Sequence, residues 1–381
     1  MIDAAAYADF LMERFPFWAG VPDSLLKPLC ACLGGKLPGS RHIVADNEGG
    51  AVALAAGHYL ATGRPAAVYM QNSGIGNAVN PLLSLCDPLV FSLPFLMLIG
   101  WRGEPGIRDE PQHLKQGIVT LPLLETMGIK CETHPDSDEA ARVMVEKAFH
   151  YMEEKKAPFA LVVKKNTFSN GHVFDAAAED SSLMSREEAI EAVLDMLNED
   201  DVYVSTTGMA SRELFELRDR KGQTHAGDFL CVGSMGHASR IAAAIALEKR
   251  KTRVVCLDGD GAVLMHMGAL AIIGAMKLPN FVHIVLNNGA HDSVGGQSTV
   301  AHDVDLCAVA AACGYKKTFR IEDKRAVDIT PACGPVFIEI IVRRGNRTDL
   351  GRPSLSPRDN KELFMERLSN LCWLKDVELG G

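Results

Sequence analysis

Short apolar runs alternate with helix-like segments along almost the entire chain, and this alternation constrains the fold more than any other feature. Parallel strands cannot be joined by a tight turn, so each pair needs a crossover connection, which is usually a helix. An alternating order is therefore typical of α/β proteins with parallel sheets. The predicted strands are residues 15–20, 42–45, 66–70, 95–99, 129–132 and 159–163, then 202–204, 229–232, 254–257, 281–286 and 336–342. Predicted helices include residues 51–61, 138–155, 262–277 and 360–371.

The alternation is interrupted once, at Ser169–Leu183. This segment is polar, rich in small residues and without periodicity, which is typical of a linker. A helix start follows at once, because Ser185 and Glu188 have the spacing of a capping box. We therefore predict two doubly wound parallel-sheet domains with no middle domain. The predicted ranges are domain 1–168, linker 169–184 and domain 185–381.

Composition narrows the class of protein. The chain of 381 residues has a formal net charge of −9, so it lacks the general positive potential that would attract nucleic acids or anionic membranes. It contains no long uncharged apolar run and no basic N-terminal segment, so neither a membrane span nor a signal peptide is expected. Its ten cysteines are scattered, most of them in apolar runs, which suits a reducing cytoplasm. An anionic small-molecule substrate remains open.

The stretch Leu257–Ala262 leaves a predicted strand with one carboxylate, Asp260, between two glycines. A tight turn is the simplest explanation. A dinucleotide-binding loop would need G-x-G-x-x-G, but position 264 is leucine, so this pattern fails. The chain has no P-loop pattern either.

A partner for Asp260 follows the next predicted strand. That strand, 281–286, leads into Asn287–Ala290. In open parallel sheets, ligands bind at the carboxyl ends of the strands, so Asp260 and Asn288 are expected at the same edge. A carboxylate, an amide oxygen and the backbone carbonyl of Ala290 form a set of hard ligands that suits Mg²⁺ together with phosphate oxygens. Helix N-termini behind both loops favour the same anion.

The spacing from Gly259 to Asn288 resembles the thiamin diphosphate motif. Two further loops, 205–211 and 232–239, resemble the segments of this superfamily that contact the cofactor. The resemblance implies that Met235 wedges under the cofactor and that the carbonyl of Gly233 accepts a hydrogen bond from its amino group. For Met235, a place in the hydrophobic core is the alternative. The cofactor-binding residues implied in this half are Thr207, Gly208, Gly233, Ser234, Met235, Asp260, Gly261, Ala262 and Asn288.

The first half supplies a carboxylate, Glu48, at the head of a helix of small residues. Desolvation makes an uncompensated charge costly there, and a hydrogen bond to a cofactor ring would offset that cost. Glu48 could instead have only a structural role, in which its negative charge is stabilised by the dipole at the helix N-terminus. Asp46 is the competing candidate for the functional carboxylate. The resemblance favours Glu48 as the catalytic group that contacts the cofactor's pyrimidine ring, and it implies cofactor binding by Asn72. It also implies a homodimer or larger homo-oligomer with sites between subunits.

Three segments resemble the phosphonopyruvate decarboxylase family closely: 45–85, 100–117 and 287–299. This resemblance implies decarboxylation of 3-phosphonopyruvate to phosphonoacetaldehyde and CO₂, in phosphonate biosynthesis. Sulfopyruvate decarboxylases share many of the features but are usually split across two subunits, so a single chain favours phosphonopyruvate. Another 2-oxo acid decarboxylase and a non-catalytic cofactor-binding subunit are the further alternatives. Glu48 argues against a pure binding subunit, because a protein that only binds the cofactor would gain little from a carboxylate at the pyrimidine ring.

A substrate with a carboxylate and a phosphonate needs cations, and basic side chains cluster after the predicted strand 95–99. Arg102, Arg108 and Lys115 are the candidate substrate-binding residues, with a solvated polar loop as the alternative. Histidine titrates near neutral pH, so His113 and His291 are candidate proton donors.

Asp23 is a further catalytic candidate. It matches the position of an active-site aspartate in related decarboxylases. The alternative is an N-cap of a helix that begins at Ser24.

Overall fold

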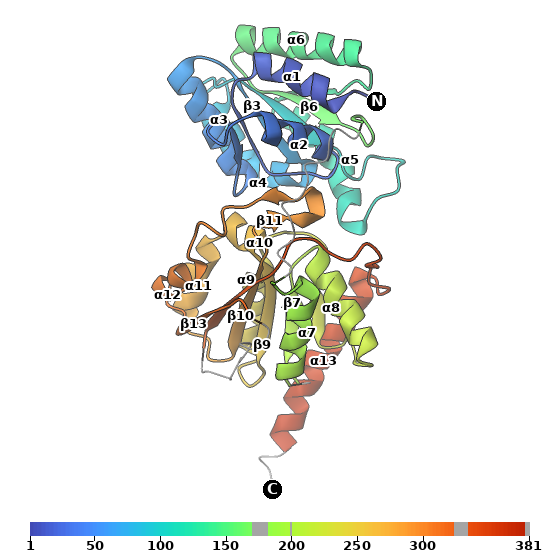
Figure 1. The fold of residues 1–381 in the computed structure, drawn as a ribbon, viewed down its shortest axis with the longest axis vertical. Coiled ribbons are helices and arrows are strands. Elements are labelled where there is room, and N and C mark those ends of the chain that lie inside the picture. The colour runs from blue at the N-terminus through green and yellow to red at the C-terminus, as the bar shows by residue number, and fades with distance from the viewer. Residues whose placement is uncertain (170–181, 199, 324–333, 378–381) are drawn as a thin grey trace. The chain divides into compact units, whose positions relative to one another are not determined.

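The structure is a computed structural model, and it describes residues 1–169, 182–198, 200–323 and 334–377. The chain divides into two compact units, Met1–Ala176 and Ala177–Gly381. Figure 1 shows that each unit has its own sheet flanked by helices. Most of the predicted linker lies outside the described residues, so the predicted domain boundaries stay a prediction.

The first unit is built on a six-stranded parallel sheet in the order β2-β1-β3-β4-β6-β5. The central strands are buried on both faces, which explains why their sequences are continuous apolar runs. The strands are β1 (Trp18–Gly20), β2 (His42–Val44), β3 (Ala66–Gln71), β4 (Phe95–Gly100), β5 (Lys130–Thr133) and β6 (Phe159–Val163).

Helices cover both faces of this sheet, as a doubly wound fold requires. One face packs against α1 (Ala4–Arg14), α2 (Lys27–Lys36) and α6 (Asp138–Lys155). The other face packs against α3 (Glu48–Thr62), α4 (Ile75–Pro81) and α5 (Pro111–Thr126). Two short helical turns, η1 (Asn72–Gly74) and η2 (Leu82–Cys86), flank α4.

The second unit repeats the plan with the order β13-β14-β10-β9-β7-β8, again parallel. A two-stranded antiparallel hairpin, β11 (Ala290–His291) with β12 (Gln297–Ser298), follows β10. The strands of the sheet are β7 (Val202–Ser205), β8 (Asp228–Leu230), β9 (Val254–Gly259), β10 (Phe281–Asn287), β13 (Lys317–Ile321) and β14 (Val336–Ile341).

Helices α7 (Arg186–Met196) and α8 (Met209–Arg220) pack on one face of the second sheet. The other face is covered by α9 (Ala238–Glu248), α11 (Gly268–Met276), α12 (Leu306–Ala312) and α13 (Pro357–Val377). The short helix α10 (Asp260–Met265) and the turn η3 (Asp292–Val294) lie at the ends of β9 and β11. Within the part of the chain that the structure describes, no helix is both long enough and apolar enough to cross a membrane.

The predicted fold class is confirmed, and so is the capping box, in which Ser185 and Glu188 bond to each other's backbone amides. The prediction of one helix over 262–277 is wrong. The structure has two helices there, α10 and α11, separated at His266, whose backbone leaves the helical region. Strand β13 and the β11–β12 hairpin were not predicted, because their short sequences carry no clear apolar period.

Candidate active site

Asp260 and Asn288 come from neighbouring strands, as the sequence predicted. Strands β9 and β10 are paired in parallel with Gly259 opposite Leu286, so the loops that follow them leave the same edge of the sheet. Asp260 is the first residue of α10 and is 2% exposed, and Asn288 is 5% exposed. The structure therefore brings a buried carboxylate and a buried amide to adjacent strand ends.

Burial raises the pKa of Asp260 to about 6. Hydrogen bonds from the Thr299 hydroxyl, 2.5 Å from Oδ2, and from the backbone amides of Gly261 and Asn288 act in the opposite direction. A divalent cation would favour the ionised form further, because an opposite charge close to a carboxylate lowers its pKa. The group is thus costly to ionise unless a cation is bound.

Asn288 is held at both ends of its amide. Its Nδ2 donates to Oδ2 of Asp292 at 2.6 Å, and its Oδ1 accepts from the backbone amide of Ala290 at 3.1 Å. Together with the carboxylate of Asp260, this amide oxygen provides the hard oxygen ligands that Mg²⁺ prefers. The donor set therefore fits a magnesium ion.

The two loops predicted to contact the diphosphate and the pyrimidine, 205–211 and 232–239, each contain a residue with positive φ. Gly208 precedes α8 with φ of +101°, a conformation that a side chain would strain. The first amides of α8 follow it, at the type of helix terminus that binds phosphate. Thr207 lies beside it and is half-buried. These features fit a diphosphate at this turn.

Met235 lies beside the Asp260 loop. A Cβ added to Gly261 would meet Cε of Met235 at 3.3 Å, and one added to Gly236 would meet the carbonyl oxygen of Ala262 at 2.9 Å. Met235 is half-buried and is not a member of the hydrophobic clusters formed by the described residues. Ser234 precedes it with φ of +53°. The core alternative for Met235 is therefore disfavoured, and the loop lies where a cofactor contact was predicted.

The ring of His291 also lies against Gly261, because an added Cβ there would meet Cε1 at 2.7 Å. Burial lowers the pKa of His291 to about 4. The imidazole is therefore neutral at neutral pH. A neutral imidazole is a weak acid, so the structure gives less support to His291 as a proton donor than the sequence suggested.

In the first unit, Glu48 begins α3 and is 4% exposed. Its Oε2 accepts from Nδ2 of Asn77 at 2.7 Å, and burial raises its pKa. The other oxygen lies against Gly74, where an added Cβ would be only 2.1 Å away. Asp46, the competing carboxylate, is exposed. The structure thus favours Glu48 over Asp46 as the buried functional carboxylate.

Asp23 is completely buried, and burial raises its pKa to about 6. Its Oδ2 accepts from the amide of Leu25 at 2.9 Å, while its Oδ1 has no hydrogen-bond partner among the described residues. The N-cap alternative is wrong, since α2 begins at Lys27 and Leu26 occupies the cap position. A buried carboxylate with an unsatisfied oxygen fits a position that awaits a ligand.

Arg102 is already engaged by a carboxylate. Its Nε and Nη2 donate to Asp109 at 2.9 and 2.5 Å, and its Nη1 donates to Oγ of Ser24 at 3.0 Å. Burial raises the pKa of Asp109, but the hydrogen bonds from Arg102 and from the amides of Glu110 and Gly103 outweigh it and lower the pKa. Arg102 is therefore a rigid, partly neutralised cation, and its pairing with Asp109 was not predicted from the sequence.

His113 on α5 is 9% exposed, and its Nδ1 has no hydrogen-bond partner among the described residues. Burial, and then the charge of Arg102, lower its pKa. Arg108 and Lys115, by contrast, have exposed side chains. Of these four basic side chains, Arg102 and His113 are therefore half-buried or buried, whereas Arg108 and Lys115 lie at the surface.

Asn72 lies in η1 and joins two other segments. Its Nδ2 donates to the carbonyl of Arg102 at 2.8 Å and to Oγ1 of Thr120 at 2.9 Å, and its Oδ1 accepts from the amide of Arg102 at 3.2 Å. Both of its donor hydrogens are used in this way. Cofactor binding by Asn72 stays a prediction, and its visible role is to hold the end of β4 against α5.

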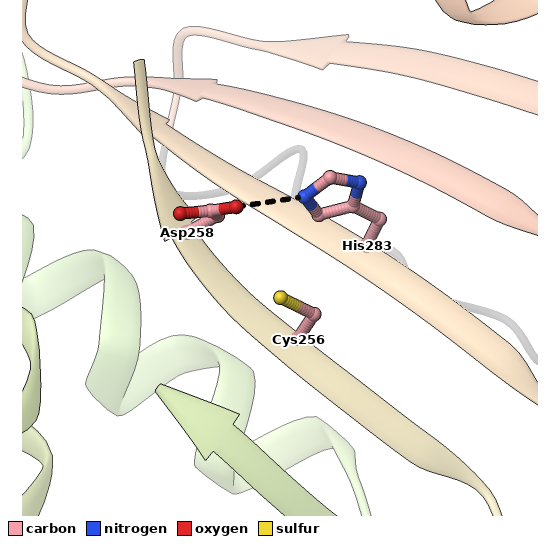
Figure 2. Close-up of side chains that lie close together, drawn as sticks. All are labelled: Cys256, Asp258 and His283. Carbon is pink, nitrogen blue, oxygen red and sulfur yellow. Dashed lines mark hydrogen bonds and ion pairs between the residues drawn. The ribbon is translucent and has the colours of Figure 1, made fainter. Parts of the chain in front are cut away.

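A buried polar cluster beneath the Asp260 loop was missed by the sequence reasoning. Figure 2 shows that Cys256 and Asp258 on β9 lie close to His283 on β10, with their potential metal-ligating atoms within 4.8 Å of one another. His283 Nε2 is 3.3 Å from Oδ2 of Asp258, and Nδ1 is 3.1 Å from the hydroxyl of Tyr315. The other oxygen of Asp258 accepts from the amide of Gly259. Because these contacts satisfy the side-chain oxygens of Asp258 and the ring nitrogens of His283, we assign this pair to support of the loop. The sequence signal that could have revealed this cluster is His283, a polar residue within the apolar strand 281–286.

Two known protein families match the two halves. Residues 6–121 match the family described as "Thiamine pyrophosphate enzyme, N-terminal TPP binding domain". Residues 206–340 match "Thiamine pyrophosphate enzyme, C-terminal TPP binding domain". The candidate residues from Glu48 to Lys115 fall within the first match, and those from Thr207 to His291 fall within the second.

Three curated relatives match almost the full chain. A phosphonopyruvate decarboxylase of Streptomyces viridochromogenes is 35% identical over 366 residues, covering 91% of this chain and 89% of the relative. A phosphonopyruvate decarboxylase of Streptomyces hygroscopicus is also 35% identical, over 369 residues, with the same shares covered. A sulfopyruvate decarboxylase of Methanosarcina acetivorans is 29% identical over 376 residues, covering 92% of this chain and 93% of the relative.

The third relative corrects one inference from the sequence. Because a sulfopyruvate decarboxylase aligns along almost its whole length, a single chain does not by itself favour phosphonopyruvate over sulfopyruvate. The higher identity to the two Streptomyces enzymes carries that preference instead. With both cofactor-binding domains and a full-length match at this identity, the chain belongs to the phosphonopyruvate decarboxylase family of thiamine pyrophosphate enzymes.

Proposed function

We propose that the chain decarboxylates 3-phosphonopyruvate to phosphonoacetaldehyde and CO₂, with thiamin diphosphate and Mg²⁺, as a step of phosphonate biosynthesis. The observation that carries the proposal is the pair of buried oxygen donors, Asp260 and Asn288, at adjacent strand ends in a chain that is 35% identical to phosphonopyruvate decarboxylases over 91% of its length. When bound, thiamin diphosphate supplies the nucleophilic carbon and the electron sink that decarboxylation of a 2-oxo acid requires.

The second unit would hold the charged end of the cofactor. Asp260, Asn288 and the carbonyl of Ala290 would bind Mg²⁺, whose remaining ligands would be phosphate oxygens and water. The turn at Thr207 and Gly208 would present backbone amides to the diphosphate at the start of α8. Gly233, Ser234 and Met235 would contact the cofactor beside Gly261.

The first unit would manage protons. Glu48 is buried with a raised pKa, so it can share a proton with a ring nitrogen of the cofactor. Asp23, with a pKa near 6, can hold a proton for the reacting carbon at neutral pH more readily than an ordinary aspartate. His113 has an unsatisfied ring nitrogen that can accept or relay that proton.

Arg102 would bind an anionic group of the substrate. Its contacts with Asp109 and Ser24 fix the guanidinium in one orientation, and three of its five N–H groups are used in these contacts. The remaining N–H groups suit an oxyanion. Recognition of phosphonate therefore rests on a pre-oriented arginine, with Arg108 and Lys115 contributing at most a weaker, solvent-screened attraction.

A homodimer or larger homo-oligomer is part of the proposal, because the family resemblance implies that two copies complete each site. Relatives named as alpha and beta subunits of sulfopyruvate decarboxylase each align with less than half of this chain. The cysteines that the structure describes are free thiols, which supports a reducing cytoplasm as the location.

The proposed substrate is tested by an aldehyde-release assay on the full chain. Phosphonopyruvate, sulfopyruvate and pyruvate are compared at equal concentration, each with and without thiamin diphosphate and Mg²⁺. We expect turnover of phosphonopyruvate to exceed the others and to require both additions. Faster release from sulfopyruvate would replace the proposed substrate, and turnover without thiamin diphosphate would overturn the proposed cofactor.

A further inference from the structure

The amide of Asn288 poses a problem of orientation. Its two ends are similar in size, but only the oxygen end can bind a metal ion, since the nitrogen end carries two hydrogens. A flipped amide would point N–H groups at the cation. The following inference rests on the magnesium site proposed above, and it concerns what selects the orientation of Asn288.

Asp292 contacts the nitrogen end of this amide. Its Oδ2 accepts from Nδ2 of Asn288 at 2.6 Å, from the amide of Gly345 at 3.0 Å and from Nη1 of Arg186 at 3.3 Å. An ionised carboxylate oxygen can only accept hydrogen bonds. If Asn288 flipped, its oxygen would face another acceptor at the same short distance, which is repulsive.

Asp292 is itself held by a buried ion pair. Arg186 and Glu213 are 7% and 2% exposed, and Nε and Nη2 of the arginine donate to the two carboxylate oxygens of the glutamate at 2.7 and 3.0 Å. Bidentate pairing of this kind fixes the plane of the guanidinium. Its remaining terminal nitrogen, Nη1, is thereby aimed at Asp292.

The ion pair joins the metal loop to two separate helices. Arg186 is the first residue of α7, and Glu213 lies in α8, whose first turn is the proposed diphosphate site. Burying a charged pair is costly unless its geometry is good and its remaining hydrogen bonds are satisfied. Here the third partner, Asp292, satisfies the arginine.

We propose that Asp292 is a positioning residue for the metal, held in place by Arg186 and Glu213, and that it selects the orientation of Asn288 in which the amide oxygen faces Mg²⁺. Removal of such an outer partner of a metal ligand typically costs 10- to 100-fold in metal affinity. The effect belongs to metal binding, because Asp292 reaches the cation only through Asn288.

The test measures thiamin diphosphate binding by calorimetry across a series of Mg²⁺ concentrations, using the full chain. In Asp292→Ala the acceptor is lost, so we expect the Mg²⁺ concentration for half-maximal cofactor binding to rise by about 10- to 100-fold. In Asp292→Asn, the three donors would hold the amide oxygen at the Oδ2 position, so the rise should stay within about threefold. At saturating Mg²⁺, both variants should recover kcat.

Asp195→Asn, which removes an exposed carboxylate in the same unit, serves as the matched control and should leave the Mg²⁺ dependence unchanged. Equal shifts for Asp292→Ala and Asp292→Asn would overturn the proposal, because charge alone would then explain the effect. An unchanged Mg²⁺ dependence in Asp292→Ala would overturn it as well. If Asp292→Ala does not fold, Arg186→Lys tests the same link. Its amine cannot contact both Glu213 oxygens and Asp292, so an intermediate rise supports the proposal and an unchanged dependence overturns it.

Failure of the proposed function would be distinguishable. If the unmodified chain binds thiamin diphosphate with Mg²⁺ but does not turn over phosphonopyruvate, the substrate is wrong and the role of Asp292 stands or falls on the binding series. If the unmodified chain shows no Mg²⁺-dependent cofactor binding, the proposed metal site is wrong, and this inference is overturned with it.

Discussion

Each of the two units is built on a six-stranded parallel sheet, but the polar side chains near the strand ends have different hydrogen-bonding environments in the two units. In the second unit, Asp260 and Asn288 are each held by partners within that unit. In the first unit, Asp23 and His113 are buried with one polar atom each that has no hydrogen-bond partner among the described residues. At the proposed metal site, the second unit thus presents two oxygen donors that hydrogen bonds already hold in place, whereas these two candidate catalytic side chains of the first unit each keep one unsatisfied polar atom. The comparison supports the proposed division of roles, in which the second unit binds the metal and the first unit transfers protons.

The largest expected effect tests the binding half of this comparison. Asp260→Ala removes the buried carboxylate of the proposed metal site, so Mg²⁺-dependent binding of thiamin diphosphate should be lost, and activity with it. Calorimetric titration of the cofactor in the presence of Mg²⁺ measures the loss. Asp195→Ala, an exposed carboxylate of the same unit, is the control. Normal cofactor affinity in Asp260→Ala would show that the second unit does not bind the metal through Asp260.

The next effect tests the proton-transfer half. Glu48→Gln keeps the size of the side chain but removes the group that can share a proton, so kcat should fall by about 10²- to 10⁴-fold while cofactor affinity changes little. Steady-state kinetics and calorimetry on the same preparation separate the two. Asp46→Asn changes an exposed carboxylate two residues away and should leave kcat intact. Loss of cofactor binding in Glu48→Gln would assign this residue to binding instead.

Asp23→Asn should show opposite effects on activity and stability. Asp23 has a pKa of about 6 in the folded protein against an ordinary value of 3.8, so folding disfavours its ionised form. The penalty is absent below pH 4, grows between pH 4 and 6 and is complete above pH 6, where it amounts to about 3 kcal/mol. The variant should therefore have a raised Tm at pH 8 and little change at pH 4, with kcat lowered by about 10²-fold.

Thermal melts at the two pH values, together with the pH profile of kcat, check this prediction. Asp9→Asn, at an exposed ion pair, is the control for the general effect of removing a carboxylate. A Tm of Asp23→Asn at pH 8 that is equal to or below that of the unmodified protein would contradict the idea that Asp23 is kept unsatisfied for function.

The smallest effect sharpens the comparison within the first unit. Arg108→Ala removes an exposed cation, so KM for phosphonopyruvate should rise by no more than about threefold, as is usual for solvent-screened charges. Arg102→Ala removes the pre-oriented guanidinium and should raise KM by at least tenfold, since charge-assisted hydrogen bonds contribute about 1.5–3 kcal/mol. Steady-state kinetics on both variants decide the matter, and a larger effect of Arg108 would reverse the assignment.

Local sequence patterns were sufficient to predict most strands and the edge at which Asp260 and Asn288 meet. Continuous apolar runs reveal buried parallel strands, and the parallel direction of neighbouring strands places the loops that follow them at the same edge of the sheet. The break at His266 was not predictable in this way, because Ala262–Lys277 is mostly apolar and contains no proline to mark an interruption.

Partners distant in the sequence were also beyond prediction. Arg186 looked like one residue of a capping box, yet it pairs with Glu213, 27 positions away, and with Asp292, 106 positions away. The pairing of Arg102 with Asp109 was not predicted either, although the two residues are only seven positions apart in one loop. Such contacts depend on how the chain returns on itself, which short-range periodicity does not encode. Asp23 shows the same limit, since its complete burial follows from packing against Gly100 at the end of β4.

The place of Arg186 at the first position of α7 has a consequence for the gene. Relatives named as separate alpha and beta subunits show that sulfopyruvate decarboxylases can be encoded in two parts. In this chain, a division between residues 186 and 292 would place Arg186 and Asp292 on separate polypeptides. A division between residues 185 and 188 would also separate the two residues of the capping box. A gene fission between the two units that keeps these contacts within one polypeptide therefore has to fall before codon 185.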